Sequence, residues 1–419
     1  MIGGEDRIIL NKLQAMLKNL FDHFKVLYQD ISEKNPHFVS EHALRQEEEV
    51  YNKSSKLTYR NAVISSIASI KRRSIPDSAS HPSVGTEGDI ATREEERRKL
   101  QALRLSVSHL EPYILTLDEM KQWGYIVEVP PGEGGDQPSA EGSIKKCERC
   151  NQPFMVKRRE EADECVFHWG KPFSSKTNGE KRRVFTCCSR TTDEDPCSRG
   201  PHVFYEKDPE DLHRRHAFSY TRQAPSATDG ETSSVHIDTA LDVVALDCEM
   251  IYSTGGMRVA RVSVVDSTGK EVFDEFVRMD EGVYIIDLNT RFSGITDENY
   301  AMALLPLSSI RKSLDSFINS DTIVIGHALE NDLKTLRMVH HRCVDTAVMF
   351  PHRAGPPYRH ALRNLVKEHL GKTIQAGGGT VGHSSVEDSI ATLDLVRWHV
   401  LNGPKPKPKL PAVPEKLDE

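Results

Sequence analysis

The feature that most constrains this sequence is an apolar run that ends in two acids. Residues 243–246 read VVAL, and Asp247 and Glu249 follow in the stretch DCEM. Side chains alternate across a β-strand, so both carboxylates point to the same face. Two like charges at the end of a buried strand repel each other and lose hydration. A fold that places them there must supply a positive charge between them.

Two further acids open predicted helices downstream. Asp332 lies in TIVIGHALENDLKTL, which reads as a strand, a turn and the first turn of a helix. Asp388 lies in GHSSVEDSIATLDLVRWHV, where apolar residues recur at helical spacing between positions 390 and 400. Each acid alone is explained as a negative charge that favours the first turn of a helix.

Considered together, the four carboxylates predict one site for Mg²⁺ or Mn²⁺, because hard cations prefer oxygen ligands. Two such ions about 3.5–4 Å apart stabilise both the attacking and the leaving oxygen of a phosphoryl displacement. A metal pair is therefore the missing positive charge. His383 precedes the last helix and has no nucleophilic Ser or Cys motif beside it, so we expect it to take the proton from the attacking water.

A second cluster predicts zinc. Six of the eight cysteines fall between positions 147 and 197, in the company of two histidines. The candidate ligands are Cys147, Cys150, Cys165, His168, Cys187, Cys188, Cys197 and His202. Eight ligands suit two tetrahedral ions, and sites filled entirely by protein ligands are structural. A single zinc ion and a set of free thiols are the alternatives; disulfides are not expected in a reducing compartment.

Composition sets the outer limits. The chain has 419 residues, which predicts two or three domains. A formal net charge of −7 argues against a chain-wide electrostatic grip on nucleic acid but allows a local basic groove. No signal-peptide pattern and no apolar run of membrane-spanning length occur, so we expect a protein of the nucleus or cytoplasm that is neither secreted nor inserted in a membrane.

The stretches ALDCEM, GHALENDL and GHSSVED resemble, in order and spacing, the three motifs of the DEDDh class of 3′–5′ exonucleases, and most of all the Rex family of RNA exonucleases. The resemblance implies that Asp247, Glu249, Asp332 and Asp388 are metal ligands and that His383 is the general base. Leu288 departs from the family, where an aromatic residue is expected. Separately, the Cys/His segment resembles the CHORD-type zinc module.

This resemblance implies an α/β protein with an RNase H-like exonuclease core, a mixed five-stranded sheet and helices on both faces. Residues LDVVALD, RVARVSVVD, EVFDEFVR and TIVIGH read as strands, in agreement. We expect hydrolysis of RNA with a free 3′ end to nucleoside 5′-monophosphates by two metal ions, in the trimming of structured non-coding RNAs. Substrate contacts are expected from Met250, Arg291, Phe292 and His327, although Phe292 is also readable as a core residue.

The predicted organisation has six parts. They are a helical region at 1–73, a largely disordered linker with a short docking segment at 74–143, a Cys/His zinc module at 144–206, a linker at 207–236, the exonuclease domain at 237–403 and a Pro/Lys-rich tail at 404–419.

The sequence leaves several alternatives open. The substrate could be DNA or short oligonucleotides, cleavage could be internal, or the chain could be a non-catalytic scaffold. The N-terminal helices could recruit a protein partner, and the oligomeric state is undetermined.

Overall fold

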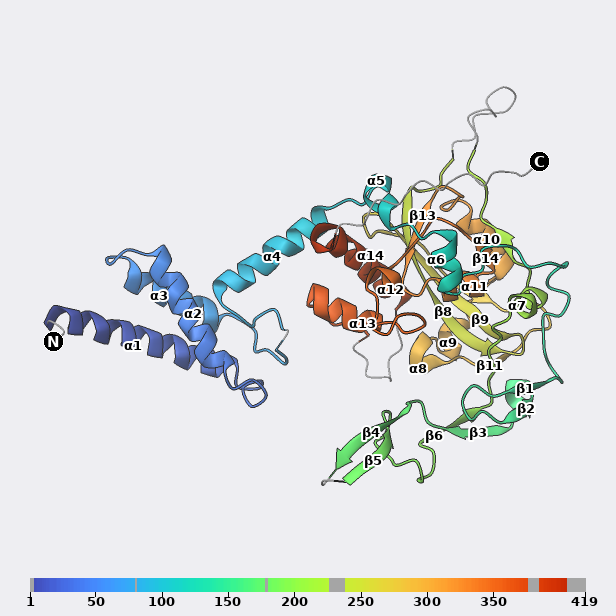
Figure 1. The fold of residues 1–419 in the computed structure, drawn as a ribbon, viewed down its shortest axis with the longest axis horizontal. Coiled ribbons are helices and arrows are strands. Elements are labelled where there is room, and N and C mark those ends of the chain that lie inside the picture. The colour runs from blue at the N-terminus through green and yellow to red at the C-terminus, as the bar shows by residue number, and fades with distance from the viewer. Residues whose placement is uncertain (1–3, 80, 178–179, 226–237, 376–383, 405–419) are drawn as a thin grey trace. The chain divides into compact units, whose positions relative to one another are not determined.

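The computed structural model describes residues 4–79, 81–177, 180–225, 238–375 and 384–404 (Figure 1). The chain divides into two compact units. The first comprises residues 1–103 together with 367–372, and the second comprises residues 104–366 together with 373–419. None of the helices within the described ranges combines the length and the apolar character needed to cross a membrane.

The first unit is helical. Its helices are α1 (Gly4–Leu27), α2 (Phe38–Lys53), α3 (Tyr59–Lys71) and α4 (Glu87–Ala102). Apolar side chains spaced along α1 to α3, including Leu20, Phe24, Ala43 and Val63, form its buried core. Amphipathic spacing thus gives a small helical bundle, as expected for a sequence that buries one stripe per helix.

The prediction of a largely disordered segment over 74–143 is wrong for α4. The helix begins with a capping box, in which Thr86 and Asp89 satisfy each other's backbone N–H groups. Just before it, the Gly85 N–H donates to the buried Tyr28 hydroxyl at 2.9 Å. Polar composition suggested disorder, but local capping and one long-range hydrogen bond hold the segment.

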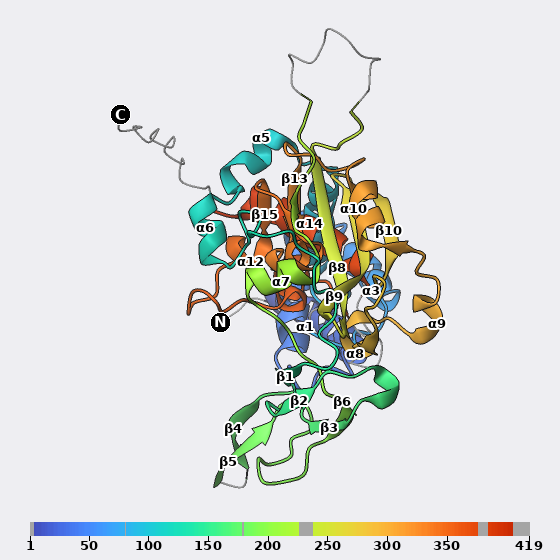
Figure 2. The ribbon, with the colours of Figure 1, turned by 90° about the vertical axis from the view of Figure 1, so that its right-hand side faces the viewer.

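The second unit is built on a mixed sheet. Its main strands are β8 (Val243–Ser253), β9 (Gly256–Asp266), β10 (Glu271–Arg278), β13 (Ile323–Gly326) and β15 (Cys343–Asp345). Their order is β10-β9-β8-β13-β15; β9 runs antiparallel to both neighbours, while β13 and β15 run parallel to β8. Figure 2 shows β8 and β9 as the long central pair. The predicted RNase H-like α/β core is confirmed, with short strands β11 (Ile285–Asp287) and β12 (Leu305–Pro306) added to the five.

Helices cover both faces of this sheet. Leu246 and Cys248 point into a core shared with α10 (Leu307–Leu314) and with Leu333 of α11 (Glu330–Thr335). On the other face lies α14 (Ser385–Asn402), where the Ser385 and Ser263 hydroxyls hydrogen-bond at 2.6 Å (Figure 1). The shorter helices are α5 (Val107–Leu110), α6 (Leu117–Gln122), α7 (Pro209–Arg215), α8 (Thr290–Ser293), α9 (Asp297–Tyr300), α12 (Thr346–Met349) and α13 (Leu362–Leu365), with a π-helical turn at Val366–Leu370.

The segment around α6 is an integral part of the sheet core. Met120, Trp123 and Tyr125 are buried in the same cluster as Leu246 of β8. The Tyr125 hydroxyl donates to Asp345 Oδ2 at 2.7 Å. The docking segment predicted within 74–143 corresponds to residues 110–129, and burial of these large side chains orders it.

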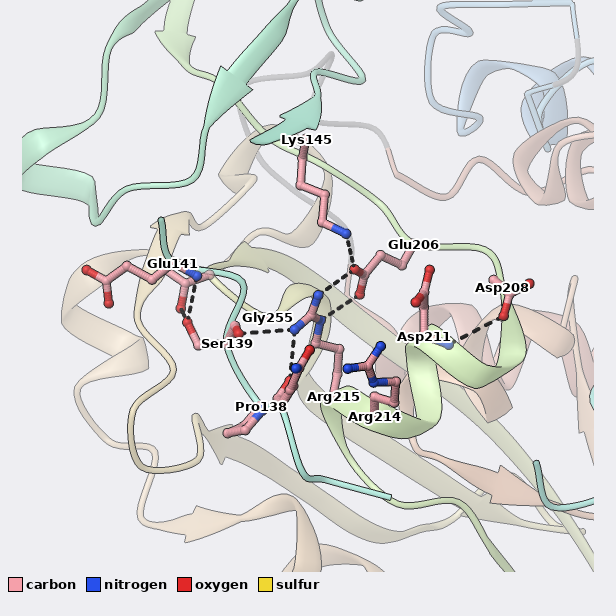
Figure 3. A network of polar contacts seen from close by, with 12 residues as sticks. Pro138, Ser139, Glu141, Lys145, Glu206, Asp208, Asp211, Arg214, Arg215 and Gly255 are labelled. Carbon is pink, nitrogen blue, oxygen red and sulfur yellow. Dashed lines mark hydrogen bonds and ion pairs between the residues drawn. The ribbon is translucent and has the colours of Figure 1, made fainter. Parts of the chain in front are cut away.

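The predicted linker at 207–236 is also partly ordered. It contains α7 and the short strand β7 (Ser219–Tyr220), which pairs with β14 (Met338–Val339). Figure 3 shows why α7 is held: Arg215 donates two hydrogen bonds to the buried Glu206 carboxylate, which also accepts from Lys145 at 2.8 Å. Arg215 further donates to the Gln137 and Ser139 carbonyls. Residues 226–237, and 405–419 of the predicted tail, lie outside the described ranges.

The Cys/His module consists of three small antiparallel pairs. These are β1 (Ile144–Lys146) with β2 (Pro153–Met155), β3 (Glu164–Phe167) with β6 (Ser198–Pro201), and β4 (Pro172–Thr177) with β5 (Glu180–Phe185). Two-stranded pairs are marginally stable alone. Aliphatic burial here is slight, so the module needs stabilisation from elsewhere.

Tyr125→Phe tests the junction between the α6 segment and the sheet. The substitution keeps the ring but removes the buried hydrogen bond to Asp345, so we expect the free energy of unfolding of the second unit to fall by about 1–2 kcal/mol. Tyr358→Phe, at an exposed tyrosine, is the matched control, and we expect it to be neutral within about 0.5 kcal/mol. Urea denaturation measures both variants. Equal effects of the two substitutions would show that the Tyr125 hydroxyl does not stabilise the second unit.

Candidate functional site

The strand β8 and the helix α14 bring three of the predicted acids together. Asp247 and Glu249 share one face of β8, and Asp247 stands opposite Ser263 of β9. Ser263 in turn contacts Ser385 at the start of α14, three residues before the buried Asp388. The hydrogen bond between the two serines therefore sets the first turn of α14 over the acidic face of β8.

The fourth acid, Asp332, reaches β8 from α11. Its Oδ1 accepts a hydrogen bond from the backbone N–H of Cys248, between the two β8 acids, at 3.1 Å. The turn before α11 is held by Asp345, whose carboxylate accepts from the Ala328 and Leu329 N–H groups at 2.9 and 3.1 Å. The strand-to-helix turn thus delivers Asp332 to the strand that carries Asp247 and Glu249.

Mutual repulsion shows that these acids form one electrostatic site. Burial raises the pKa of Asp247 well above its ordinary value, and the charges of Asp332, Glu249 and Asp388 raise it further. Burial and the charge of Asp388 raise the pKa of Glu249 to about 8, against the opposing effect of Arg261. Burial also raises the pKa of Asp388 to about 6. Asp247 and Glu249 resist ionisation because they are buried and because other acids of the set lie near them, whereas Asp388 resists it mainly because it is buried.

The donor set fits hard divalent cations. Glu249 Oε1 is buried and accepts no hydrogen bond from any residue that the structure describes. Arg261, directly across from Glu249 on β9, is already engaged by Asp274 through two hydrogen bonds of 2.8 and 2.6 Å. Four carboxylates gathered at one place are the ligand type that Mg²⁺ or Mn²⁺ takes.

The Cys/His module holds two further groups of ligands. One is Cys147, Cys150, Cys165 and His202, and the other is His168, Cys187, Cys188 and Cys197; within each group the ligand atoms lie within 4.8 Å of one another. The four carboxylates do not form so tight a group in the described structure, but ligands shared between two ions about 3.5–4 Å apart span a wider distance. All eight cysteines are free thiols. The arrangement suits two tetrahedral ions, one per group.

Of the other predicted site residues, His327 and Met250 lie within the described ranges. His383 lies outside the described ranges, so its role stays a prediction. His327 follows β13, and its Nδ1 lies 2.9 Å from Thr346 Oγ1; burial lowers its pKa. Met250 packs against the core cluster of Leu246, on the face of β8 opposite Glu249.

Two predicted substrate residues lie on α8. The Phe292 ring is 42% exposed, so its alternative assignment to the core does not hold. Arg291 places its guanidinium 5.5 Å from the ring centre of Trp169 in the Cys/His module. Leu288, the departure from the family pattern, is buried with Ile251 and Ile295.

Sequence reasoning missed several residues that touch the site. Gln375 donates to Asp388 Oδ2 at 2.8 Å. Arg359 pairs with the buried Glu330, next to Asp332 in the same short helix, and burial raises the pKa of Glu330 to about 7. The extra acid in GHALENDL was visible in the sequence, but its partner lies 29 residues away. Gln375 and Arg359 carry no local pattern that would have identified them.

Comparisons with known proteins find that the chain is similar to RNA exonucleases. A sequence profile of the RNA exonuclease 3 middle domain matches residues 145–200. The chain is 35% identical over 311 residues to the RNA exonuclease 1 homolog of Homo sapiens (72% of this chain, 24% of the relative). It is 37% identical over 293 residues to RNA exonuclease 3 of Schizosaccharomyces pombe (68% of this chain, 49% of the relative). The chain thus spans half or less of the length of these two curated relatives.

Among solved structures, the catalytic unit of Pan2 from Neurospora crassa, with its protease and nuclease domain, is similar with a TM-score of 0.34 and 20% sequence identity. The match covers 52% of this chain and 38% of the Pan2 chain.

The raised pKa of Glu249 predicts a pH-dependent stability without Mg²⁺. The folded state holds this proton up to about pH 8, whereas an unfolded glutamate loses it near its ordinary value of 4.5. The free energy of unfolding should therefore fall as pH rises between these values. Glu249→Gln should remove the part of that loss that comes from Glu249 and make the Mg²⁺-free protein more stable at pH 8, on the order of a few kcal/mol, but not below pH 4.5.

Thermal melts at pH 4 and pH 8, with and without MgCl₂, measure this effect. Glu275→Gln, at an exposed position on the neighbouring β10, is the control and should leave the profile unchanged. Added Mg²⁺ should raise the melting temperature of the parent protein at pH 8 more than that of Glu249→Gln. A variant that is less stable than the parent at pH 8 without Mg²⁺ would contradict the shared acidic site.

Proposed function

Since this chain is an RNA exonuclease 3-like protein, we propose that it is a 3′–5′ exoribonuclease that releases nucleoside 5′-monophosphates from RNA 3′ ends. The observation that carries the proposal is the convergence of four mutually repelling carboxylates from β8, α11 and α14. A site of this kind is stable and useful only with cations bound, and phosphodiester hydrolysis is the chemistry that two such cations favour.

Asp247, Glu249, Asp332 and Asp388 would hold the two ions, with Asp247 shared between them. When bound, Mg²⁺ or Mn²⁺ polarises the scissile phosphate and lowers the pKa of a coordinated water. Glu249 would also orient the terminal ribose hydroxyl. His383 would accept the proton of the attacking water, a role that rests on its place in the motif GHSSVED.

RNA is the preferred substrate in this proposal because the curated relatives quoted above are named as RNA exonucleases. Trimming of structured non-coding RNAs, in the nucleus or the cytoplasm, is the cellular role we propose. The helical first unit is proposed as a contact for a protein partner, since the acidic site lies wholly in the second unit.

The two Cys/His groups are proposed to bind structural zinc. Cys165→Ser and Cys188→Ser each remove a ligand from one group, so each variant should retain one zinc ion where the parent holds two. Cys343→Ala, at a buried core cysteine outside both groups, should retain both ions. Elemental analysis of the purified proteins gives the count; a parent with one ion, or an unchanged count in either variant, would contradict this assignment.

The activity is tested with 5′-end-labelled single-stranded RNA and Mg²⁺. We expect a ladder that shortens from the 3′ end. Asp388→Asn should lower the rate by more than the roughly 10–100-fold that loss of an outer-shell partner costs. Glu387→Gln, at the exposed neighbour of Asp388, is the matched control and should keep most of the activity.

Two further substrates separate the alternatives. A circular RNA should survive, because an exonuclease needs an end; its cleavage would indicate an internal nuclease. A DNA of the same sequence should be degraded more slowly if the 2′-hydroxyl is recognised. Failure of the folded, zinc-loaded protein to digest any of these would favour the scaffold function.

A further inference from the structure

A small aromatic and basic cluster joins the Cys/His module to the loop that follows β11. Trp169 of the module meets Phe292 of α8 edge to face, with ring centres 5.5 Å apart and planes at 70°. The Arg291 guanidinium lies 5.5 Å from the same Trp169 ring. Phe292 remains 42% exposed despite this contact. The cluster therefore offers solvent an aromatic ring with a cation beside it.

Arg149 of the module binds the N-terminal end of the loop that carries Arg291 and Phe292. This side chain is only 6% exposed and pairs with Asp287 at 2.6 Å. Its guanidinium also lies 4.6 and 4.9 Å from the ring centres of Phe167 and Trp169. Asp287 in turn accepts the Asn289 N–H at 2.7 Å, at the start of α8.

The position of Arg149 is in turn fixed by the group formed by Cys147, Cys150, Cys165 and His202. It lies between Cys147 and Cys150, and its backbone N–H donates to Cys147 Sγ at 3.3 Å. The loop is held at its other end by a second module arginine: Arg159 makes two hydrogen bonds to Asp297, of 2.7 and 3.2 Å. The loop from 287 to 297 is thus fixed at both ends by the module.

This loop lies on the acidic side of β8. Ile251 shares a face with Asp247 and Glu249, because side chains alternate along the strand. Ile251 packs directly against Leu288 and Ile295, which flank α8. Asp287 pairs with Tyr252, three residues beyond Glu249, a distance of about 10 Å along a strand. At a stacked spacing of about 3.4 Å per nucleotide, this corresponds to about three nucleotides.

We propose that Phe292 and Arg291 bind single-stranded RNA a few nucleotides upstream of the 3′ end, and that Trp169 and Arg149 of the Cys/His module position them. Phe292 would stack on a base and Arg291 would pair with the backbone, the combination that binds single strands without sequence preference. The Cys/His module is then part of the substrate site. This proposal rests on the proposed function, because the acidic site defines where the 3′ end lies.

The experiment compares an octanucleotide with a dinucleotide, which is too short to reach the loop. In Mg²⁺, Phe292→Ala and Trp169→Ala should raise KM for the octanucleotide by about 5- to 100-fold, the value of one stacked base, with kcat nearly unchanged. Hydrolysis of the dinucleotide should be unaffected. Phe292→Trp should restore the octanucleotide KM, whereas Phe292→Leu, which keeps the apolar bulk, should not.

Phe173→Ala is the matched control, since Phe173 is an exposed aromatic residue of β4 in the same module. It should leave both substrates unchanged. Zinc content and melting temperature identify any variant that has lost the module; Phe292→Ala, at an exposed ring, keeps the proposal testable if Trp169→Ala misfolds. Equal losses on both substrates, or no loss for Phe292→Ala, would overturn the proposal.

Binding to a fluorescein-labelled octanucleotide in Ca²⁺, measured by anisotropy, separates this proposal from the proposed function. A parent protein that binds the RNA but hydrolyses nothing in Mg²⁺ would refute the nuclease, while weaker binding by Phe292→Ala would still support the surface. A parent that hydrolyses RNA, with binding unchanged in Phe292→Ala and Trp169→Ala, would refute the surface and leave the nuclease standing. A parent that does not bind would refute the surface.

Discussion

Repulsion around Asp247, a half-buried carboxylate with the buried acids Glu249, Asp332 and Asp388 near it, is the constraint on which the second unit depends. Burial raises the pKa values of Asp247, Glu249, Asp332 and Asp388, and the charges of the other acids raise those of the first three further, so the site opposes folding unless protons or cations compensate. Backbone and hydroxyl hydrogen bonds, from Cys248 to Asp332 and from Ser263 to Ser385, hold the acids in place without neutralising them. The negative charge of such a site is then left for a bound metal ion to neutralise.

Much of this site was predictable because its signals are local. Alternation along β8 places Asp247 and Glu249 on one face, and an apolar strand followed by a helix start predicts where Asp332 lies. The eight candidate ligands of the module were equally visible as its cysteines and histidines. Their division into two groups was not, because Cys147 and Cys150 join Cys165 and His202 across the intervening Cys187 and Cys188. Because the ligands of the two groups alternate along the chain, their spacing in the sequence does not show which of them meet in space.

The missed parts share a different cause. The α6 segment was expected only to dock, yet it is part of the sheet core, and its Tyr125 hydroxyl bonds to Asp345, 220 residues away. Helix α7 follows a polar stretch and is held by the Glu206–Arg215 pair and by carbonyls of residues 137 and 139. In both cases a few long-range contacts overcome a local preference for disorder. Composition indicates how much apolar surface a segment can bury. It does not show whether a distant part of the chain will pack against that surface.

Arg149 shows how such a partner can join two otherwise separate elements. A buried guanidinium is costly unless it is paired, and here one ion pair and several aromatic rings share that cost. The Arg149 backbone lies in the turn between Cys147 and Cys150, whereas its guanidinium pairs with Asp287 in the loop beside the acids. Neither the module nor the loop can shift without leaving a buried charge unpaired. A module that serves only as a flexible tether does not require such a buried ion pair. A module that holds α8 at a fixed distance from the 3′ end of a bound strand does require it.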